Sequence, residues 1–131
     1  MITVLICVHS MNELHDKFLS DALFSLRSQT YKDFKTIIVL DECWDKTKKV
    51  VEEIKFDKDT LLVIERDKKE GLAYAKNYGL SFVDTEYVAF LDADDLYEPT
   101  KLEKQAEFIK DNDVDFIGTQ HSEINIYDRV T

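Results

Sequence analysis

Apolar residues along this chain form short continuous runs that alternate with longer stretches of helical spacing. The short runs are rich in β-branched residues and predict buried strands over residues 2–8, 36–40, 61–65, 87–91 and 114–118. Between them, apolar residues recur every three or four positions, which predicts helices over residues 14–29, 45–54, 71–82 and 99–109. Residues 123–127 alternate like an edge strand. A chain of this order is expected to form a three-layer α/β/α sandwich around a mostly parallel, Rossmann-like sheet.

The composition is that of one globular domain, which we expect to cover residues 1–131. Hydrophobic residues make up 44% of the chain and charged residues 34%, a balance that excludes a disordered protein. The formal net charge of −10, with no basic patch to offset it, argues against nucleic acid as a partner. An anionic ligand would therefore need a metal ion or a few well-placed cations to hold it.

The two cysteines, Cys7 and Cys43, lie at the ends of predicted strands and form no Cys-x-x-Cys pair. We interpret both as free thiols of a reducing compartment, with neither a zinc site nor a disulfide required. The sequence contains no signal peptide and no apolar run of about 18 residues that could span a membrane. A cytoplasmic location is expected, with peripheral contact to the inner face of a membrane left open.

Three carboxylates, Asp92, Asp94 and Asp95, follow the predicted strand over residues 87–91. Ligands of open α/β sheets bind beyond the carboxyl ends of the strands, so these acids are expected in a binding crevice. Clustered acids repel one another unless a cation lies between them, and the glycine-rich phosphate loop of dinucleotide-binding proteins is absent. The pattern predicts a metal site for a phosphorylated ligand. For Asp95, a cap of the following helix is an equally good interpretation.

Four parts of the chain match the motifs of a known family, in the family's order. They are Ser10-Met11-Asn12 after the first strand; Ser28-Gln29-Thr30-Tyr31-Lys32-Asp33-Phe34; Ile38-Val39-Leu40-Asp41-Glu42 with Asp45 and Thr47; and Gly71-Leu72-Ala73-Tyr74-Ala75-Lys76-Asn77-Tyr78-Gly79 followed by Asp92-Ala93-Asp94. This combination resembles the family 2 glycosyltransferases of GT-A fold, in the N-terminal part that binds the nucleotide-sugar. The chain departs from the family pattern around the expected base and phosphate pocket, at His9, Met11, Cys43, Trp44 and Lys76.

The resemblance implies a role for each acid. Asp94 is expected to be the principal ligand of Mn2+ or Mg2+ and to connect the metal to the donor diphosphate. Asp92 is expected to face the ribose or to complete the metal shell through water. At the end of the second strand, an acid of this family accepts a hydrogen bond from the nucleotide base, expected here to be uracil. Both Asp41 and Glu42 are candidates for that acid, and a helix cap is the alternative for each.

Other candidates for nucleotide binding are a histidine and several cations. His9 lies at the crevice end of the first strand, where its ring could line the base pocket or serve a structural role. Lys76 lies in the helix after Gly71 and could contact the diphosphate. Arg66, Lys68 and Lys69, in the loop before that helix, are weaker candidates for the same contact.

The resemblance implies inverting transfer of a sugar from a nucleoside-diphosphate sugar, expected to be UDP-linked, to a hydroxyl of a saccharide or lipid-linked acceptor. In that family the catalytic base comes from the second half of the domain, and we find no counterpart before Thr131. We therefore expect a nucleotide-sugar-binding domain that is truncated relative to a full GT-A transferase domain.

Two alternatives remain open at this point. One is a non-catalytic nucleotide-binding or assembly module derived from a transferase. The other is a receiver-type signalling domain, which has a similar length and strand–helix alternation. A receiver domain needs an acid pair directly after its first strand, and here Glu13 and Asp16 come only within the following helix.

Overall fold

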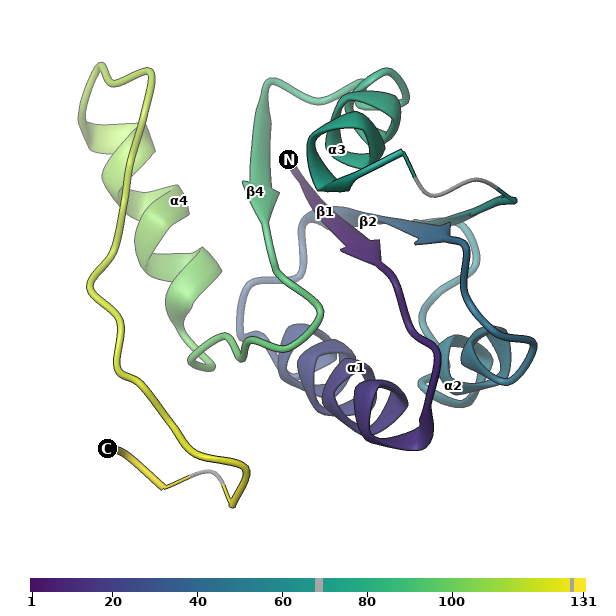
Figure 1. The fold of residues 1–131 in the computed structure, drawn as a ribbon. Helices are drawn as coiled ribbons and strands as arrows, with labels where there is room; N and C mark the ends of the chain where they lie inside the picture. The colour runs from purple at the N-terminus through teal and green to yellow at the C-terminus, as the bar shows by residue number, and fades with distance from the viewer. Residues whose placement is uncertain (68–69, 128) are drawn as a thin grey trace.

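The computed structural model describes residues 1–67, 70–127 and 129–131, in which strands and helices alternate (Figure 1). The elements are β1 (Ile2–Val8), α1 (Glu13–Arg27), β2 (Phe34–Asp41), α2 (Thr47–Glu53), β3 (Leu61–Arg66), α3 (Leu72–Leu80), β4 (Tyr87–Phe90) and α4 (Lys101–Asp111). The four strands and four helices predicted within residues 2–111 are therefore present, with ends shifted by a few residues.

The strands form one all-parallel sheet in the order β3-β2-β1-β4. β1 lies in the interior and pairs with β2 from Ile2 opposite Phe34 to Val8 opposite Leu40. On its other side it pairs with β4, beginning at Ile2 opposite Tyr87. Because all the strands are parallel, the carboxyl ends of β1, β2 and β4 face the same edge of the sheet, and the loops that leave them can share one site.

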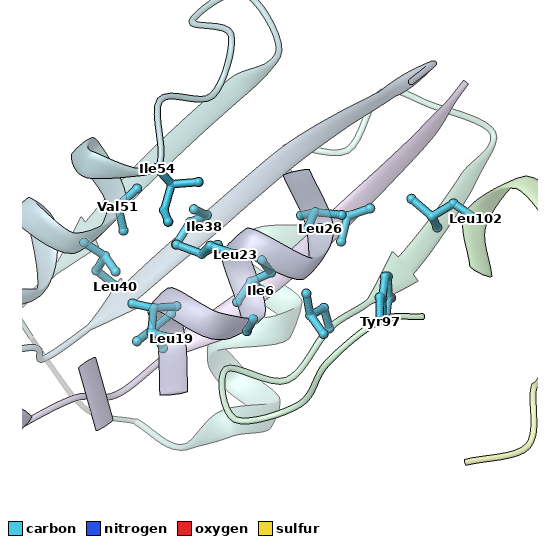
Figure 2. Close-up of a cluster of buried hydrophobic side chains, with 14 residues drawn as sticks. Ile6, Leu19, Leu23, Leu26, Ile38, Leu40, Val51, Ile54, Tyr97 and Leu102 are labelled. Atoms are coloured by element: carbon cyan, nitrogen blue, oxygen red, sulfur yellow. The ribbon is translucent and has the colours of Figure 1, made fainter. Parts of the chain in front are cut away.

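Helices cover both faces of the sheet, which confirms the three-layer α/β/α sandwich (Figure 1). α3 covers one face, where Ala75 packs against Leu5, Ile37 and Val39. The other face packs mainly against α1 and α2 in a larger cluster (Figure 2). Its buried members are Val4, Ile6, Val8, Leu19, Ala22, Leu23, Leu26, Ile38, Leu40, Val51, Ile54, Leu91, Tyr97 and Leu102. Successive residues of β1 and β2 serve opposite faces, as expected for strands buried on both sides.

Gly79 marks a close approach of α3 to the sheet, and replacing it with alanine tests how tight that packing is. A Cβ atom at this position would lie 2.5 Å from Leu5 Cδ1 and 3.1 Å from Val39 Cγ2, both in the buried cluster. Overpacking of this kind costs about 1–3 kcal/mol, and the gain in helix propensity returns at most about 1 kcal/mol. We expect Gly79→Ala to lower the free energy of unfolding by about 1 kcal/mol in urea titrations. The exposed neighbour Asn77, replaced with alanine, is the control; a more stable Gly79→Ala protein would contradict the expectation.

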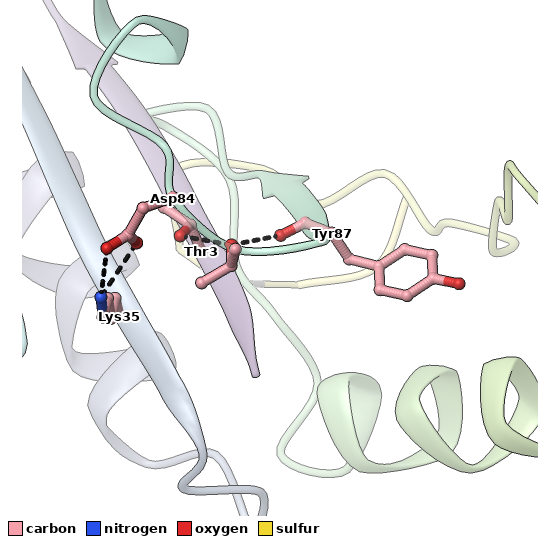
Figure 3. A network of polar contacts seen from close by, with 5 residues as sticks. Thr3, Lys35, Asp84 and Tyr87 are labelled. Carbon is pink, nitrogen blue, oxygen red and sulfur yellow. Dashed lines mark hydrogen bonds and ion pairs between the residues drawn. The ribbon is translucent and has the colours of Figure 1, made fainter.

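Polar contacts at the amino ends of the strands fix the start of β4 (Figure 3). Lys35 Nζ lies 2.8 and 2.9 Å from the two carboxylate oxygens of Asp84. The Thr85 hydroxyl donates to the carbonyl of Tyr87 at 2.9 Å and lies 2.7 Å from the Thr3 hydroxyl, which acts as its donor. These contacts join the segment before β4 to β1 and β2, and so they help to set where the acids after β4 emerge.

The two strands predicted after α4 are wrong. Residues 112–123 form neither helix nor strand, and Phe116 is 88% exposed. In residues 123–127, only Ile124 makes a β-bridge, an isolated antiparallel contact with Val130. Figure 1 shows this part of the chain as an extended trace apart from the sheet. An apolar run becomes a strand only where a neighbouring strand satisfies its backbone groups, and within the described chain nothing pairs with this one.

The described helices include none whose length and apolar character would allow it to cross a bilayer.

Candidate functional site

The carboxyl edge of the sheet brings most of the predicted residues into two pairs. At the end of β1, His9 Nδ1 lies 3.1 Å from the carbonyl oxygen of Asp41, at the end of β2. Beyond β4, Asp92 Oδ1 lies 3.3 Å from Lys76 Nζ, which α3 supplies. We call His9, Asp41 and Glu42 together the base corner. We call the loop of residues 91–97 the acid loop.

Cys7, near the end of β1, lies between the base corner and the acid loop. Burial raises the pKa of its thiol to about 11. The positive charge of Lys76 acts in the opposite direction, and the negative charges of Asp41 and Asp92 add to the rise. Charges from both groups therefore act on the same thiol. The thiol itself is protonated at neutral pH and is not a nucleophile.

A cavity of about 1130 Å³ lies beside the acid loop. Lys76, Asp92, Asp94 and Asp95 line one side, and residues of α4 and of the segment 119–124 line the other. The base corner is not part of this lining. The acids predicted to hold a metal thus line a cavity. The residues predicted to contact the base lie outside it.

The acid loop turns tightly and is held to the body of the domain. The amide of Asp95 donates to the carbonyl oxygen of Asp92 at 3.1 Å, which closes the turn after β4. At the far end, the Tyr97 hydroxyl donates to the carbonyl of Phe90, and the Tyr97 amide donates to Ser25 Oγ of α1 at 3.1 Å. These contacts fix the backbone between Asp92 and Tyr97 while the three carboxylates stay exposed.

The negative charges of the acid loop act on two of its titratable groups, Asp95 and Tyr97. Partial burial raises the pKa of Asp95, and the charges of Asp94 and Asp92 raise it further, against a smaller opposing effect from His121. Burial also raises the pKa of Tyr97, and the charges of Asp92 and Asp95 contribute. The loop therefore carries a concentration of negative charge that a bound cation would relieve.

The donor set of the acid loop fits a hard divalent cation that is held jointly with a ligand. Among the described residues, no three His, Cys, Asp or Glu side chains are placed to hold a metal ion together. Mg2+ in phosphate-binding sites commonly takes only one or two carboxylates, and phosphate oxygens and water complete its shell. Asp94 fits this role because, within the described chain, it forms no ion pair or hydrogen bond.

Arg66 lies next to the base corner, a position that the sequence did not predict for it. Arg66 Nη1 lies 3.7 Å from Asp41 Oδ1, and these two atoms are buried without a hydrogen-bond partner in the described part of the chain. The Arg66 guanidinium also donates to Glu70 at 2.7 Å and stacks on the rings of Tyr74 and Tyr78, 4.6 and 4.7 Å away.

The hydrogen bond to Glu70 and the charge of Asp41 raise the pKa of Arg66, against the effect of burial. Arg66, a candidate for contact with the diphosphate, lies beside Asp41, one of the two candidates for the acid that contacts the base. Lys68 and Lys69, the other loop candidates, lie outside the described residues.

The two acids of the base corner differ in their surroundings. Asp41 is 5% exposed and faces Arg66. Glu42 is exposed and has a φ of 51°, a left-handed conformation that a non-glycine residue rarely adopts. Its amide donates to the Arg66 carbonyl at 2.9 Å, which holds this turn at the end of β2.

Asp16, which no sequence motif singled out, contacts the loops that carry the base corner. This α1 carboxylate is 7% exposed and accepts hydrogen bonds from Ser10 Oγ at 2.6 Å, Thr47 Oγ1 at 2.8 Å and Trp44 Nε1 at 2.9 Å. Its position three residues before Leu19 places it on the buried stripe of α1. An acid on an apolar stripe is the signal that could have identified it.

Comparison with known proteins decides the family. The sequence model for glycosyl transferase family 2 matches residues 4–129. The chain belongs to this family. Membership confirms the resemblance and excludes the receiver domain.

The chain is similar to the O-antigen biosynthesis glycosyltransferase WbnJ of Escherichia coli, with 30% identity over 122 residues that cover 91% of this chain and 45% of the relative. It spans less than half the length of the first curated relatives that it matches.

Solved structures of glycosyltransferases have the same fold. S. aureus TarS in complex with UDP-GlcNAc superposes with a TM-score of 0.76 at 24% identity, covering 92% of this chain and 37% of TarS. The mannosyltransferase PcManGT of Pyrobaculum calidifontis, in complex with GDP-Man and Mn2+, gives a TM-score of 0.64 at 25% identity, covering 73% of this chain and 28% of PcManGT. The four-stranded parallel sheet of this family 2 member thus has the GT-A arrangement predicted from the sequence.

Proposed function

We propose that this chain is the donor-binding part of a glycosyltransferase. The enzyme would transfer a sugar from a UDP-linked donor to a hydroxyl of a saccharide or lipid-linked acceptor, with inversion and with the help of a divalent metal ion. The observation that carries the proposal is the placement of Asp92 and Asp94. In a family 2 chain, they lie at the carboxyl end of β4 on the wall of a cavity, with the cation Lys76 beside them.

At the acid loop, Asp94 would bind Mn2+ or Mg2+, and Asp92 would contact the ribose or complete the metal shell. The metal supplies positive charge that stabilises the departing nucleoside diphosphate. Lys76 Nζ, 3.3 Å from Asp92, adds a fixed positive charge close to the place where the diphosphate would lie. The complex of PcManGT with GDP-Man and Mn2+ supports this assignment, since a similar protein binds a nucleotide-sugar together with a metal.

At the base corner, His9, Asp41 and Glu42 would contact the nucleotide base. Asp41 Oδ1 is a buried acceptor and Arg66 Nη1 a buried donor, and neither has a hydrogen-bond partner in the described part of the chain. Uracil offers an N–H donor next to a carbonyl acceptor, an edge whose hydrogen-bonding pattern complements these two groups. Thymine and guanine offer the same edge and cytosine does not, so we favour UDP as the donor nucleotide because of the similar protein TarS, whose complex contains UDP-GlcNAc.

Calorimetric titration with UDP, GDP, CMP and dTDP, each with and without Mn2+, tests the proposed function. We expect UDP to bind most tightly and its affinity to depend on the metal. Pyrophosphate, which has no base, is the control for binding at the acid loop alone. Equal affinities for all four nucleotides that do not change with Mn2+ would overturn the proposal. UDP binding in the absence of any transfer by the full-length protein would favour a non-catalytic nucleotide-binding module.

A further inference from the structure

Asp16 joins three separate parts of the chain. It lies in the first turn of α1, where its amide donates to the Asn12 carbonyl at 3.2 Å. Its Oδ1 atom accepts from Ser10, in the loop after β1, and from Thr47, the first residue of α2. Its Oδ2 atom accepts from the indole of Trp44, in the loop after β2. All three donors converge on one buried carboxylate.

The two loops that Asp16 holds are those that carry the base corner. His9 directly precedes Ser10, and Glu42 is two residues before Trp44. The loops also contact each other, since the Trp44 amide donates to the Ser10 carbonyl at 2.9 Å and Cys43 Sγ donates to the Val8 carbonyl at 3.3 Å. A movement of either loop would shift His9 relative to Asp41 and Glu42.

We propose that Asp16 is a positioning residue for nucleotide-base recognition. It would act through Ser10, Trp44 and Thr47, without touching the ligand, by holding the loops after β1 and β2 in the arrangement that presents His9, Asp41 and Glu42. This inference rests on the proposed function. The acid loop lies after β4, and neither Asp16 nor its three donors belong to it. Removal of Asp16 therefore affects recognition of the base and not binding of the diphosphate.

The chemistry of the donors distinguishes aspartate, asparagine and alanine at this position. An indole N–H can only donate, whereas the hydroxyls of Ser10 and Thr47 can donate or accept. An asparagine oriented with its oxygen toward Trp44 and its amide toward the two hydroxyls keeps all three contacts. Alanine loses all three and leaves the indole N–H without its partner. Asp16→Asn is thus the conservative variant and Asp16→Ala the disruptive one.

The test measures the affinities of Asp16→Ala and Asp16→Asn for UDP and for pyrophosphate, both with Mn2+, beside the unfolding free energy in urea. We expect Asp16→Ala to weaken UDP binding by about tenfold and to leave pyrophosphate binding within about twofold, because the hydrogen bonds that it removes involve a charged group. Asp16→Asn should restore UDP affinity to within about threefold of the wild-type value. Ile2→Val, a small core change at the far end of β1, is the control for a general loss of stability.

Two milder variants keep the test informative if Asp16→Ala does not fold. Trp44→Phe and Thr47→Val each remove one donor at nearly constant volume, and each should weaken UDP binding without weakening pyrophosphate binding. Unchanged UDP affinity in Asp16→Ala, or in both milder variants, would overturn the positioning role. Equal losses for UDP and pyrophosphate would also overturn it. If the wild-type chain itself prefers no nucleotide over pyrophosphate, the proposed function fails, and the inference fails with it.

Discussion

Replacing Asp94 with alanine is expected to abolish the metal dependence of UDP binding. In the presence of Mn2+ the affinity for UDP should fall by about a hundredfold, to the value that the wild-type chain has without the metal. Loss of a direct ligand should weaken metal binding at least as much as mutation of the residues that orient the ligands does. Asp94 is exposed on the cavity wall and, in the described chain, has no ion pair that would have to be broken before it could bind a cation. Titration calorimetry with and without Mn2+ measures the effect directly.

Asp95→Ala is the matched control for this experiment. It removes a carboxylate one residue away in the same exposed turn, but the amide of Asp95 already closes that turn through the Asp92 carbonyl. Its loss should change UDP affinity by less than about threefold, since an exposed charge nearby contributes little. The assignment of Asp94 would be wrong if its alanine variant kept the metal dependence and the Asp95 variant lost it.

The acids after β4 could be predicted from the sequence because everything that defines them is local. A buried apolar run ends, and carboxylates follow within a few residues. The fold was predictable for a similar reason, since the strands are continuous apolar runs and the helices have apolar residues every three or four positions. The strand predicted over residues 114–118 was wrong because an apolar run says nothing about whether another strand lies beside it.

The base corner could not be predicted in full, because it depends on the pairing of strands. Asp41 meets Arg66 because these residues lie opposite each other in the parallel register of β2 and β3. That register is set by packing and not by any spacing in the sequence. Asp16 is a comparable case, since its donors Trp44 and Thr47 lie 28 and 31 positions away. Only the folded chain brings these groups together.

Gln29 is the second residue for which we expect a large effect. It is completely buried at the end of α1, and its Nε2 donates to the carbonyls of Ser25 at 3.2 Å and Glu98 at 2.8 Å. Its Oε1 accepts from the amide of Leu102 at 3.1 Å, in the first turn of α4. Gln29→Leu would leave the Leu102 amide without its partner, whereas the Glu98 carbonyl would still accept from the Lys101 amide at 3.0 Å. We expect it to lower the free energy of unfolding by about 1–3 kcal/mol in urea, the cost of one buried unpaired group.

Gln105→Leu is the matched control, because Gln105 is also largely buried but, among the described residues, its side chain pairs only with Lys101 Nζ, at 2.8 Å. That change should cost less than about 1 kcal/mol, since it unpairs a lysine that can turn to water. Equal destabilisation by the two leucine variants would show that Gln29 contributes only its volume. A selective effect of Gln29→Leu would mean that α1 anchors the far end of the chain segment that carries Asp92 and Asp94.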